Sequence, residues 1–377
     1  MKYYIIAGEA SGDLHGSNLM KALFEADKTA DIRFWGGDLM QNVGGTLVSH
    51  FKERAFMGFF EVIKNLTKVL NFIKFCKEDI ATFQPDVIIF IDNSGFNLRI
   101  AKWSKQQGFR TNYYISPQVW ASRAARVEDI KRDIDNMFVI LPFEKEFYRK
   151  FDYEVTFVGH PLIDAIADRN KVDIWDFRNQ NNLDERPIIA ILPGSRKQEI
   201  TKMLAVMLSI IDDFKDYQFV IAGAPSQDPE FYSSFIADEN VYFVENCTYD
   251  LLSVSHAAMV TSGTATLETA LFKVPEVVCY KTSWISYQIG KRLVKLKYIS
   301  LVNLILDKEV VTELIQETFN TKRLTKELTS ILKGPIREAQ FEAYHELETK
   351  LGGADRSNVL SKHFLQSYCR LFHPLGL

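Results

Sequence analysis

Short apolar runs alternate with amphipathic helical stretches along most of this chain, and this alternation constrains the fold more than any other feature. Tyr3–Ala7, Val87–Ile91 and Met137–Leu141 are apolar runs that end at a glycine, an aspartate and a proline. A second set begins at Ile188–Leu192 and continues to Ala257–Val260. Strands that alternate with crossover helices form parallel sheets covered by helices. We therefore predict an α/β fold with two Rossmann-like domains that bind a ligand between them, at the carboxyl ends of the strands.

The length of the chain also favours two domains. Its 377 residues exceed what one hydrophobic core usually supports. Residues 168–187 are polar and turn-rich, which indicates a linker between an N-terminal domain of residues 1–167 and a C-terminal domain of residues 188–353. Residues 354–377 are predicted to form a C-terminal helix that packs back towards the N-terminal domain.

Composition excludes several classes of protein. A net charge of −3 does not favour nucleic-acid binding, because no excess of basic residues neutralises phosphates. The N-terminal apolar run is too short for a signal peptide, and no apolar run is long enough to span a bilayer. The cysteines are scattered without Cys-x-x-Cys spacing, so a cytoplasmic protein without zinc is expected: Cys76, Cys247, Cys279 and Cys369.

The segment from Ser262 to Glu268 has the pattern of an anion site. Small residues at a strand-to-helix turn leave backbone N–H groups unpaired, where the helix dipole also favours an anion. Glu268 lies about one turn inside the helix, where its carboxylate could accept hydrogen bonds from a ribose diol. The segment therefore indicates a nucleotide-sugar site, formed by Ser262, Gly263, Thr264, Ala265, Thr266 and Glu268. The alternative is an ordinary helix capped by Ser262 or Thr264.

A second strand-to-helix loop contains Gly194, Ser195 and Arg196. A cation in the first turn of a helix opposes the helix dipole, which indicates a partner anion such as a diphosphate. Pairing of Arg196 with Glu199 is the alternative.

Two N-terminal loops carry further candidate residues. Asp92 follows a buried strand, where a carboxylate could remove a proton from a sugar hydroxyl, although it could also cap the next helix. The loop from Gly8 to Gly16 departs from the GxGxxG spacing of dinucleotide sites. It brings together four hydrogen-bonding side chains, which we interpret as a ligand loop with a structural turn as the alternative: Glu9, Ser11, Asp13 and His15.

Basic and aromatic residues share helical faces in two segments. Phe60, Phe72 and Phe75 lie outside the core stripe of a predicted helix at Gly58–Ile80, near Lys64 and Lys68. Residues 277–306 contain no acidic residue and interleave aromatic with basic ones, namely Lys281, Lys291, Arg292, Lys295 and Lys297. This combination suits an anionic lipid surface. Burial within the protein, or a solvated helix face, is the alternative.

Together these motifs resemble those of the lipid-A-disaccharide synthases, a family of inverting glycosyltransferases with the GT-B architecture. The matching motifs run in family order: Ala7–Asp13, Met57–Val62, Ile91-Asp92 with Phe96-Asn97, Tyr114–Trp120, Leu141–Glu144, Val158–Pro161, Leu192–Arg196, Ser262–Glu268, Lys291–Lys295 and Tyr298–Leu301. The resemblance implies transfer of diacylglucosamine from its UDP donor to diacylglucosamine 1-phosphate. It also implies peripheral association with the inner face of the inner membrane of a Gram-negative-type bacterium, with a homo-oligomer as an open possibility.

The resemblance also assigns roles to residues. It implies that Asp92 is the general base and that Glu268 contacts the ribose. Ser195-Arg196 and Ser262–Thr266 match diphosphate-binding loops, and Asn303 and Gln316 match further donor-side positions. Because arginine and helix termini stabilise the diphosphate, neither a metal nor another cofactor is expected.

The chain departs from the family pattern at Gly95, where a second aspartate is common, so a mechanism with two carboxylates is not expected. Val302 and Thr312 also stand where prolines are frequent. Two other functions stay open from the sequence. One is a UDP-sugar 2-epimerase, and the other is a nucleotide-sugar-binding or lipid-binding module without turnover.

Overall fold

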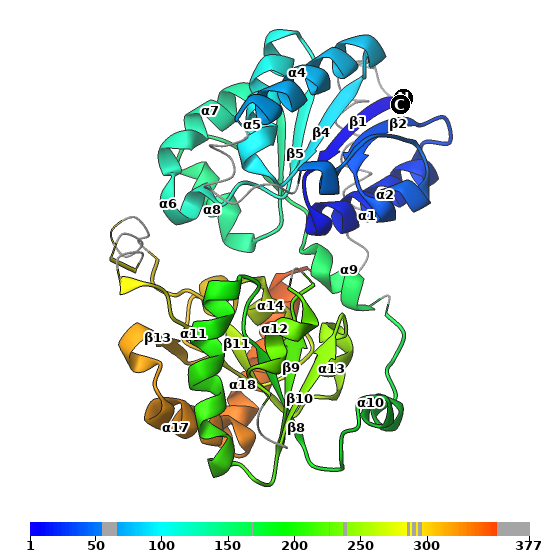
Figure 1. Ribbon diagram of the computed structural model, residues 1–377. Helices are drawn as coiled ribbons and strands as arrows, with labels where there is room; N and C mark the ends of the chain where they lie inside the picture. Colours follow the sequence, from blue (N-terminus) through cyan, green and yellow to red (C-terminus); the bar gives the residue numbers. More distant parts are fainter. Residues whose placement is uncertain are drawn as a thin grey trace. The chain divides into compact units, whose positions relative to one another are not determined.

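The computed structural model describes residues 1–54, 66–167, 169–225, 227–236, 240–284, 287–288, 292 and 296–352. The chain divides into two compact units (Figure 1). The first contains Met1–Asp164 together with Leu351 and Gly352, and the second contains Ala165–Lys350.

Within the described residues, the first unit is built on a parallel sheet of seven strands in the order β3-β2-β1-β4-β5-β6-β7. Its strands are β1 (Lys2–Ala7), β2 (Asp31–Gly36), β3 (Thr46–His50), β4 (Val87–Ile91), β5 (Thr111–Tyr114), β6 (Asn136–Val139) and β7 (Thr156–Phe157). Its helices are α1 (Ala10–Ala26), α2 (Asp38–Val43), α4 (Leu66–Phe83), α5 (Ser94–Gln106), α6 (Val119–Ser122), α7 (Val127–Asp133), α8 (Pro142–Arg149) and α9 (Pro161–Ala167), the last of which runs past the unit boundary. Short 3-10 turns are η1 (Phe51–Arg54) and η2 (Ala124–Arg126).

The central strand β4 shows why this sheet is covered on both faces. All five of its residues are buried, and successive side chains point to opposite faces of the sheet. Ile88 packs with Ile100 of α5, whereas Ile89 packs with Leu19 of α1. Helices α4 and α5 therefore cover one face and α1 the other (Figure 1).

The second unit repeats this arrangement with six parallel strands, among the described residues, in the order β10-β9-β8-β11-β12-β13. Its strands are β8 (Ile188–Leu192), β9 (Gln218–Gly223), β10 (Val241–Glu245), β11 (Ala257–Thr261), β12 (Glu276–Tyr280) and β13 (Glu313–Ile315). Its helices are α10 (Ile174–Gln180), α11 (Lys197–Met207), α12 (Pro229–Ser233), α13 (Thr248–Val254), α14 (Thr264–Leu271), α16 (Leu301–Leu306), α17 (Thr321–Leu332) and α18 (Pro335–Lys350), with 3-10 turns η3 (Leu208–Asp213) and η4 (Gln316–Thr318).

Both sheets have a topological switch point, where the strand order reverses. It lies between β1 and β4 in the first unit and between β8 and β11 in the second. Ligands of open α/β sheets bind outside the carboxyl ends of the strands at such points. The loops after β1 and β4 contain Glu9 and Asp92, and the loops after β8 and β11 contain Arg196 and Ser262.

The segment predicted as a linker is part of the second unit. Asp173 caps α10 by accepting hydrogen bonds from the N–H groups of Trp175 and Asp176. Phe177 and Leu183 are buried against the first strand of the second sheet, in one cluster with Ile188. Residues 168–187 were predicted to be a linker because they are mostly polar, but Phe177 and Leu183 pack this segment onto the second unit.

The last described residues, Leu351 and Gly352, belong to the first unit. The N–H of His160 donates a hydrogen bond to the carbonyl of Leu351 at 3.1 Å. The predicted helix of residues 354–377 lies outside the described residues. None of the described helices combines the length and apolar character needed to cross a bilayer.

Helix α18 docks on the second sheet beside the buried residue Glu276. The Glu276 N–H donates to the Gln340 side-chain oxygen at 3.0 Å, and Tyr344 donates to the same oxygen at 3.1 Å. The carboxyl oxygens of Glu276 are fully buried, and neither has a hydrogen-bond partner within the described structure. Burial therefore raises the pKa of Glu276 well above its usual value.

We predict that Glu276→Gln removes a pH dependence of stability. Because the pKa of Glu276 is higher in the folded than in the unfolded state, its protonation contributes to stability. This contribution is fully present at a pH below the unfolded-state pKa and is lost as the pH rises through the folded-state pKa. The slope is about 1.4 kcal/mol per pH unit between the two pKa values. Urea unfolding at pH 5 and pH 8 should show a smaller stability difference for Glu276→Gln than for the unsubstituted protein. Glu342→Gln, at an exposed position on the same helix, is the control, and equal pH dependence of all three proteins would refute the prediction.

Candidate active site

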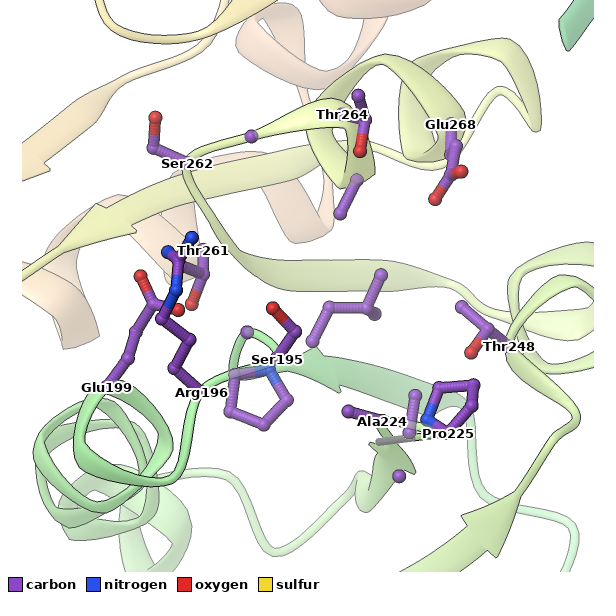
Figure 2. Close-up of a pocket in the computed structure, with 17 residues that line it drawn as sticks. Ser195, Arg196, Glu199, Ala224, Pro225, Thr248, Thr261, Ser262, Thr264 and Glu268 are labelled. Atoms are coloured by element: carbon purple, nitrogen blue, oxygen red, sulfur yellow. The ribbon is translucent and has the colours of Figure 1, made fainter. Parts of the chain in front are cut away.

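A cavity of about 460 Å³ lies at the carboxyl ends of β8, β9 and β11 in the second unit. Figure 2 shows the residues around it, which come from the loops that lead into α11, α13 and α14. Its lining residues are Leu192–Arg196, Glu199, Ala222–Pro225, Thr248, Thr261–Ala265 and Glu268. Both loops predicted from the sequence to bind a diphosphate therefore line one cavity.

Helix α14 offers an uncapped N-terminus to this cavity. It begins at Thr264, and Gly263 before it has no side chain that could cap the helix. First-turn N–H groups of a helix can bind an anion, which the helix dipole also favours. In α14 the Thr266 N–H already donates to the carbonyl of Gly263 at 3.3 Å, which leaves the N–H groups before it for an anion. Ser262 anchors the loop between β11 and α14, because its hydroxyl donates to the carbonyl of Ile299 at 2.9 Å.

The loop after β8 is shaped by Gly194, which has a φ of +106°. A Cβ at this position would lie 2.7 Å from a carboxylate oxygen of Glu199, so a larger residue would displace that side chain. Ser195 and Arg196 are exposed at the start of α11. Figure 2 shows the Arg196 guanidinium near Thr261 on the wall of the cavity.

Glu268 brings a carboxylate to the cavity from the second turn of α14. Its Oε1 accepts a hydrogen bond from the Tyr249 hydroxyl at 3.0 Å. Burial raises the pKa of Glu268, and the Tyr249 hydrogen bond opposes this effect. Thr266, also predicted here, is buried, and its hydroxyl donates to the carbonyl of Gly263 at 2.9 Å. Thr266 therefore supports the loop and does not line the cavity.

Asn303 and Gln316 are not among the residues that line the cavity. The Asn303 amide nitrogen donates to the carbonyl of Val311 at 2.8 Å and to Glu313 at 2.9 Å. Its oxygen accepts from the N–H groups of Val310 and Val311, so this buried side chain fixes the turn after α16. The Gln316 oxygen accepts from the N–H of Thr282 at 3.2 Å. In this structure both side chains support loops.

In the first unit, Asp92 has a strained backbone. Asp92 and Asn93 have φ values of +46° and +43°, in the left-handed region that non-glycine residues seldom adopt. The carbonyl of Asp92 accepts hydrogen bonds from the Asn97 amide at 2.9 Å and from the Tyr113 hydroxyl. These two contacts hold the turn in place. The sequence motif includes Asn97, whereas Tyr113 on the neighbouring strand had no sequence signal.

The Asp92 turn is packed against the loop after β1. A Cβ on Gly8 would lie 1.9 Å from the side-chain amide nitrogen of Asn93. Only glycine therefore allows the Asn93 side chain to lie this close to the loop after β1. Burial raises the pKa of Asp92 to about 6, and the negative charge of Glu9 adds to the increase. Asp92 is thus poised to exchange a proton near neutral pH.

The other predicted residues of the first loop have different surroundings. Asp13 is buried, and its carboxylate accepts from the N–H groups of Gly37, Leu39 and Met40, so it caps α2 and is structural. Ser11 is exposed at the start of α1.

His15 lies beside Tyr114, with ring centroids 6.5 Å apart. Burial lowers the pKa of His15 to about 4, and burial together with His15 lowers the pKa of His160 to about 3. Both rings are therefore neutral at pH 7.

The predicted lipid-contact residues fall into three groups. Phe60, Lys64, Lys291 and Lys295 lie outside the described residues. Lys68 and Arg292 are exposed. Phe72 is half-buried and packs edge-on against Trp35 at 6.3 Å, so it belongs to the core. Phe75 also contacts Trp35 but is 45% exposed, and Leu70, on a different face of α4, is 53% exposed.

The two parallel sheets, each covered by helices, with a cavity at the switch point between β8 and β11, define an α/β protein of the GT-B class. Solved structures confirm this fold. The UDP-GlcNAc 2-epimerase from Neisseria meningitidis bound to UDP-GlcNAc has a TM-score of 0.66 and 13% identity, covering 98% of this chain and 100% of that one. CalG4, the calicheamicin glycosyltransferase, has a TM-score of 0.60 and 12% identity, covering 97% and 98%. At these identities the likeness shows the fold alone.

Sequence comparison identifies the family. The pattern of the lipid-A-disaccharide synthetase family matches residues 3–365. The lipid-A-disaccharide synthase of Syntrophus aciditrophicus (strain SB) is 38% identical, covering 95% of this chain and 96% of that protein. The enzyme of the same name from Geobacter metallireducens is 36% identical, covering 90% of each. The chain belongs to the lipid-A-disaccharide synthetase family and is a glycosyltransferase that uses a sugar nucleotide and a glucosamine phosphate.

We predict that Glu9→Gln lowers the pKa of Asp92. Removing a nearby negative charge makes ionisation of Asp92 easier, although the contribution from burial remains. The measurement is a titration of ¹³C-labelled aspartate carboxyl signals by NMR, with the Asp92 signal assigned by its loss in Asp92→Asn. The signal should titrate near pH 6 in the unsubstituted protein and at lower pH in Glu9→Gln. Glu25→Gln, at an exposed position on α1, is the control, and an unchanged midpoint in Glu9→Gln would contradict the prediction.

Proposed function

We propose that this glycosyltransferase moves 2,3-diacylglucosamine from its UDP donor to 2,3-diacylglucosamine 1-phosphate. The product is the β-1,6-linked lipid A disaccharide 1-phosphate, and UDP is released. Family membership supports the reaction. The observation that carries the assignment of the site is the cavity that joins the uncapped start of α14, Arg196 and Glu268.

The donor binds in this cavity of the second unit. The diphosphate accepts hydrogen bonds from the first-turn N–H groups of α14 and pairs with Arg196. Glu268 accepts hydrogen bonds from the ribose hydroxyls. Negative charge develops on the departing UDP, and donors fixed before the reaction stabilise it without reorganisation. This arrangement supplies the charge stabilisation with residues of the chain, so neither a metal nor another cofactor is needed.

Asp92 acts as the general base for the acceptor. With a pKa of about 6 it is ionised at pH 7 in a ratio of roughly ten to one. It takes the proton from the acceptor hydroxyl while that oxygen forms a bond to the anomeric carbon. The attack comes from the face opposite the diphosphate, whose bond to the anomeric carbon breaks at the same time. The configuration of the anomeric carbon is therefore inverted. Gly95 stands where a second aspartate is common in the family, so we assign Asp92 as the single carboxylate of this mechanism.

The acyl chains of both substrates require a lipid surface. We place the enzyme at the inner face of the inner membrane as a peripheral protein. On α4, exposed Phe75 shares a helix face with exposed Lys68, two turns earlier, and this combination of apolar and basic side chains suits an anionic membrane surface.

Turnover tests the reaction directly. The protein is incubated in detergent with UDP-diacylglucosamine and diacylglucosamine 1-phosphate, and disaccharide and UDP are measured. Asp92→Asn keeps the shape but removes the base, so the rate should fall by about 10²-fold to 10⁴-fold. Asp216→Asn, at an exposed turn, should keep full activity.

Four outcomes would count against the proposal. Folded protein that makes no disaccharide would refute the reaction, and epimerisation of a UDP-sugar would favour the epimerase. Full activity of Asp92→Asn would refute the role of the base. Loss of activity with EDTA and its recovery with Mg²⁺ would refute metal independence.

Membrane binding has its own prediction. Phe75→Glu should strongly reduce co-flotation with vesicles that contain anionic lipid, because a charge replaces the apolar contact. Ile336→Glu, at a residue of the second unit that is 49% exposed, controls for the loss of an exposed apolar side chain. Equal flotation of the two variants would contradict the placement of the surface on α4.

A further inference from the structure

Tyr249 stands directly behind the donor cavity. It follows Thr248, which lines the cavity, at the start of α13, whereas Glu268 comes from α14. The Tyr249 hydroxyl donates to Oε1 of Glu268 at 3.0 Å. Tyr249 itself is not among the lining residues, so it reaches a ligand only through Glu268.

The ring of Tyr249 is held by neighbours of its own. The Arg169 guanidinium lies 5.1 Å from the ring centroid, within the range of a cation–π contact. Arg169 also pairs with Asp250, the residue after Tyr249. The ring of Phe272 lies 5.3 Å away, and the N–H of Phe272 donates to the carbonyl of Glu268. These contacts restrict the ring and therefore the direction of its hydroxyl.

The protonation states suit this contact. Burial and the nearby Glu268 raise the pKa of Tyr249 beyond the physiological range, so the phenol keeps its proton and donates. Burial raises the pKa of Glu268, and the hydrogen bond from Tyr249 counters this by favouring the ionised carboxylate. An ionised carboxylate accepts hydrogen bonds on both oxygens. One oxygen is thus oriented by Tyr249, and the carboxylate points into the cavity on the same side as Thr248 (Figure 2).

We propose that Tyr249 is a positioning residue that orients Glu268 and thereby makes the donor site select a ribonucleoside diphosphate over its 2′-deoxy analogue. This inference rests on the proposed function, which places a nucleoside diphosphate in the cavity. It adds that recognition of the 2′-hydroxyl depends on a residue that does not touch the ligand.

The selectivity follows from the geometry of a diol. The two neighbouring ribose hydroxyls can both donate only to a carboxylate whose plane is held in one orientation. Without the Tyr249 hydroxyl, the Glu268 carboxylate can rotate. Its ionised form also loses the hydrogen bond that Tyr249 donates to it. The diphosphate contacts at α14 and Arg196 are unaffected, so binding of the 2′-deoxy ligand should change little.

Calorimetric titration of the full chain with UDP and with 2′-deoxy-UDP tests the proposal. A hydrogen bond to a charged group corresponds to a preference for UDP of about 10-fold to 100-fold in the unsubstituted protein. Tyr249→Phe should reduce UDP affinity by about 5-fold to 20-fold and leave 2′-deoxy-UDP nearly unchanged. Glu268→Gln should lose the preference as well. Tyr217→Phe, also in the second unit, controls for loss of a phenolic hydroxyl and should keep it.

A second measurement separates positioning from folding. Because the Tyr249 hydrogen bond lowers the pKa of Glu268, UDP binding by Tyr249→Phe should weaken more than that of the unsubstituted protein as pH falls from 8 to 6. A purely structural role would weaken both ligands equally at every pH.

The outcomes are distinguishable from those of the proposed function. If the unsubstituted protein binds neither nucleotide, the proposed donor site fails, and this inference fails with it. If the unsubstituted protein prefers UDP and Tyr249→Phe keeps the full preference and pH dependence, only the positioning role is overturned.

Discussion

Parallel pairing of β8 with β11 is the constraint on which the donor site depends. The pairing places the carboxyl ends of both strands at one edge of the sheet, so the loops before α11 and α14 lie side by side. Each helix begins at this edge, and first-turn N–H groups with the helix dipole make it electropositive without a bound ion. The cavity is therefore a consequence of topology, and the proposed function assigns Arg196 and Glu268, which line it, to a nucleoside diphosphate.

The first unit uses the same topology for the opposite purpose. The loop after β4 presents a carboxylate in place of N–H donors, and its left-handed backbone is stabilised through the Asp92 carbonyl by Asn97 and Tyr113. Strain of this kind persists only where surrounding contacts determine the conformation. Proximity to Glu9 and partial burial then adjust the proton affinity of Asp92 to the physiological range. In the proposed function, the same fold thus provides an anion site in one unit and a base in the other.

The sequence predicted those features that depend on local pattern. Apolar runs located the main strands, and small residues after Thr261 indicated a helix N-terminus that lines the cavity. Contacts between distant segments could not be read in this way. Asp13 and Asn303 were predicted as ligand residues. Their hydrogen-bond partners are backbone groups of other loops, which the sequence pattern does not reveal. Tyr249 gave no signal, since its role depends on the packing of α13 beside α14.

The central claim is that the chain holds the diphosphate of the donor with helix N–H groups and Arg196, without a metal. A crystal structure of the protein with UDP, grown with Mg²⁺ in the solution, tests it most directly. We expect phosphate oxygens within hydrogen-bond distance of the N–H groups at the start of α14 and of Arg196, with the ribose hydroxyls on Glu268 and no metal between them. A diphosphate bound away from α14, or held through a metal ion, would contradict it.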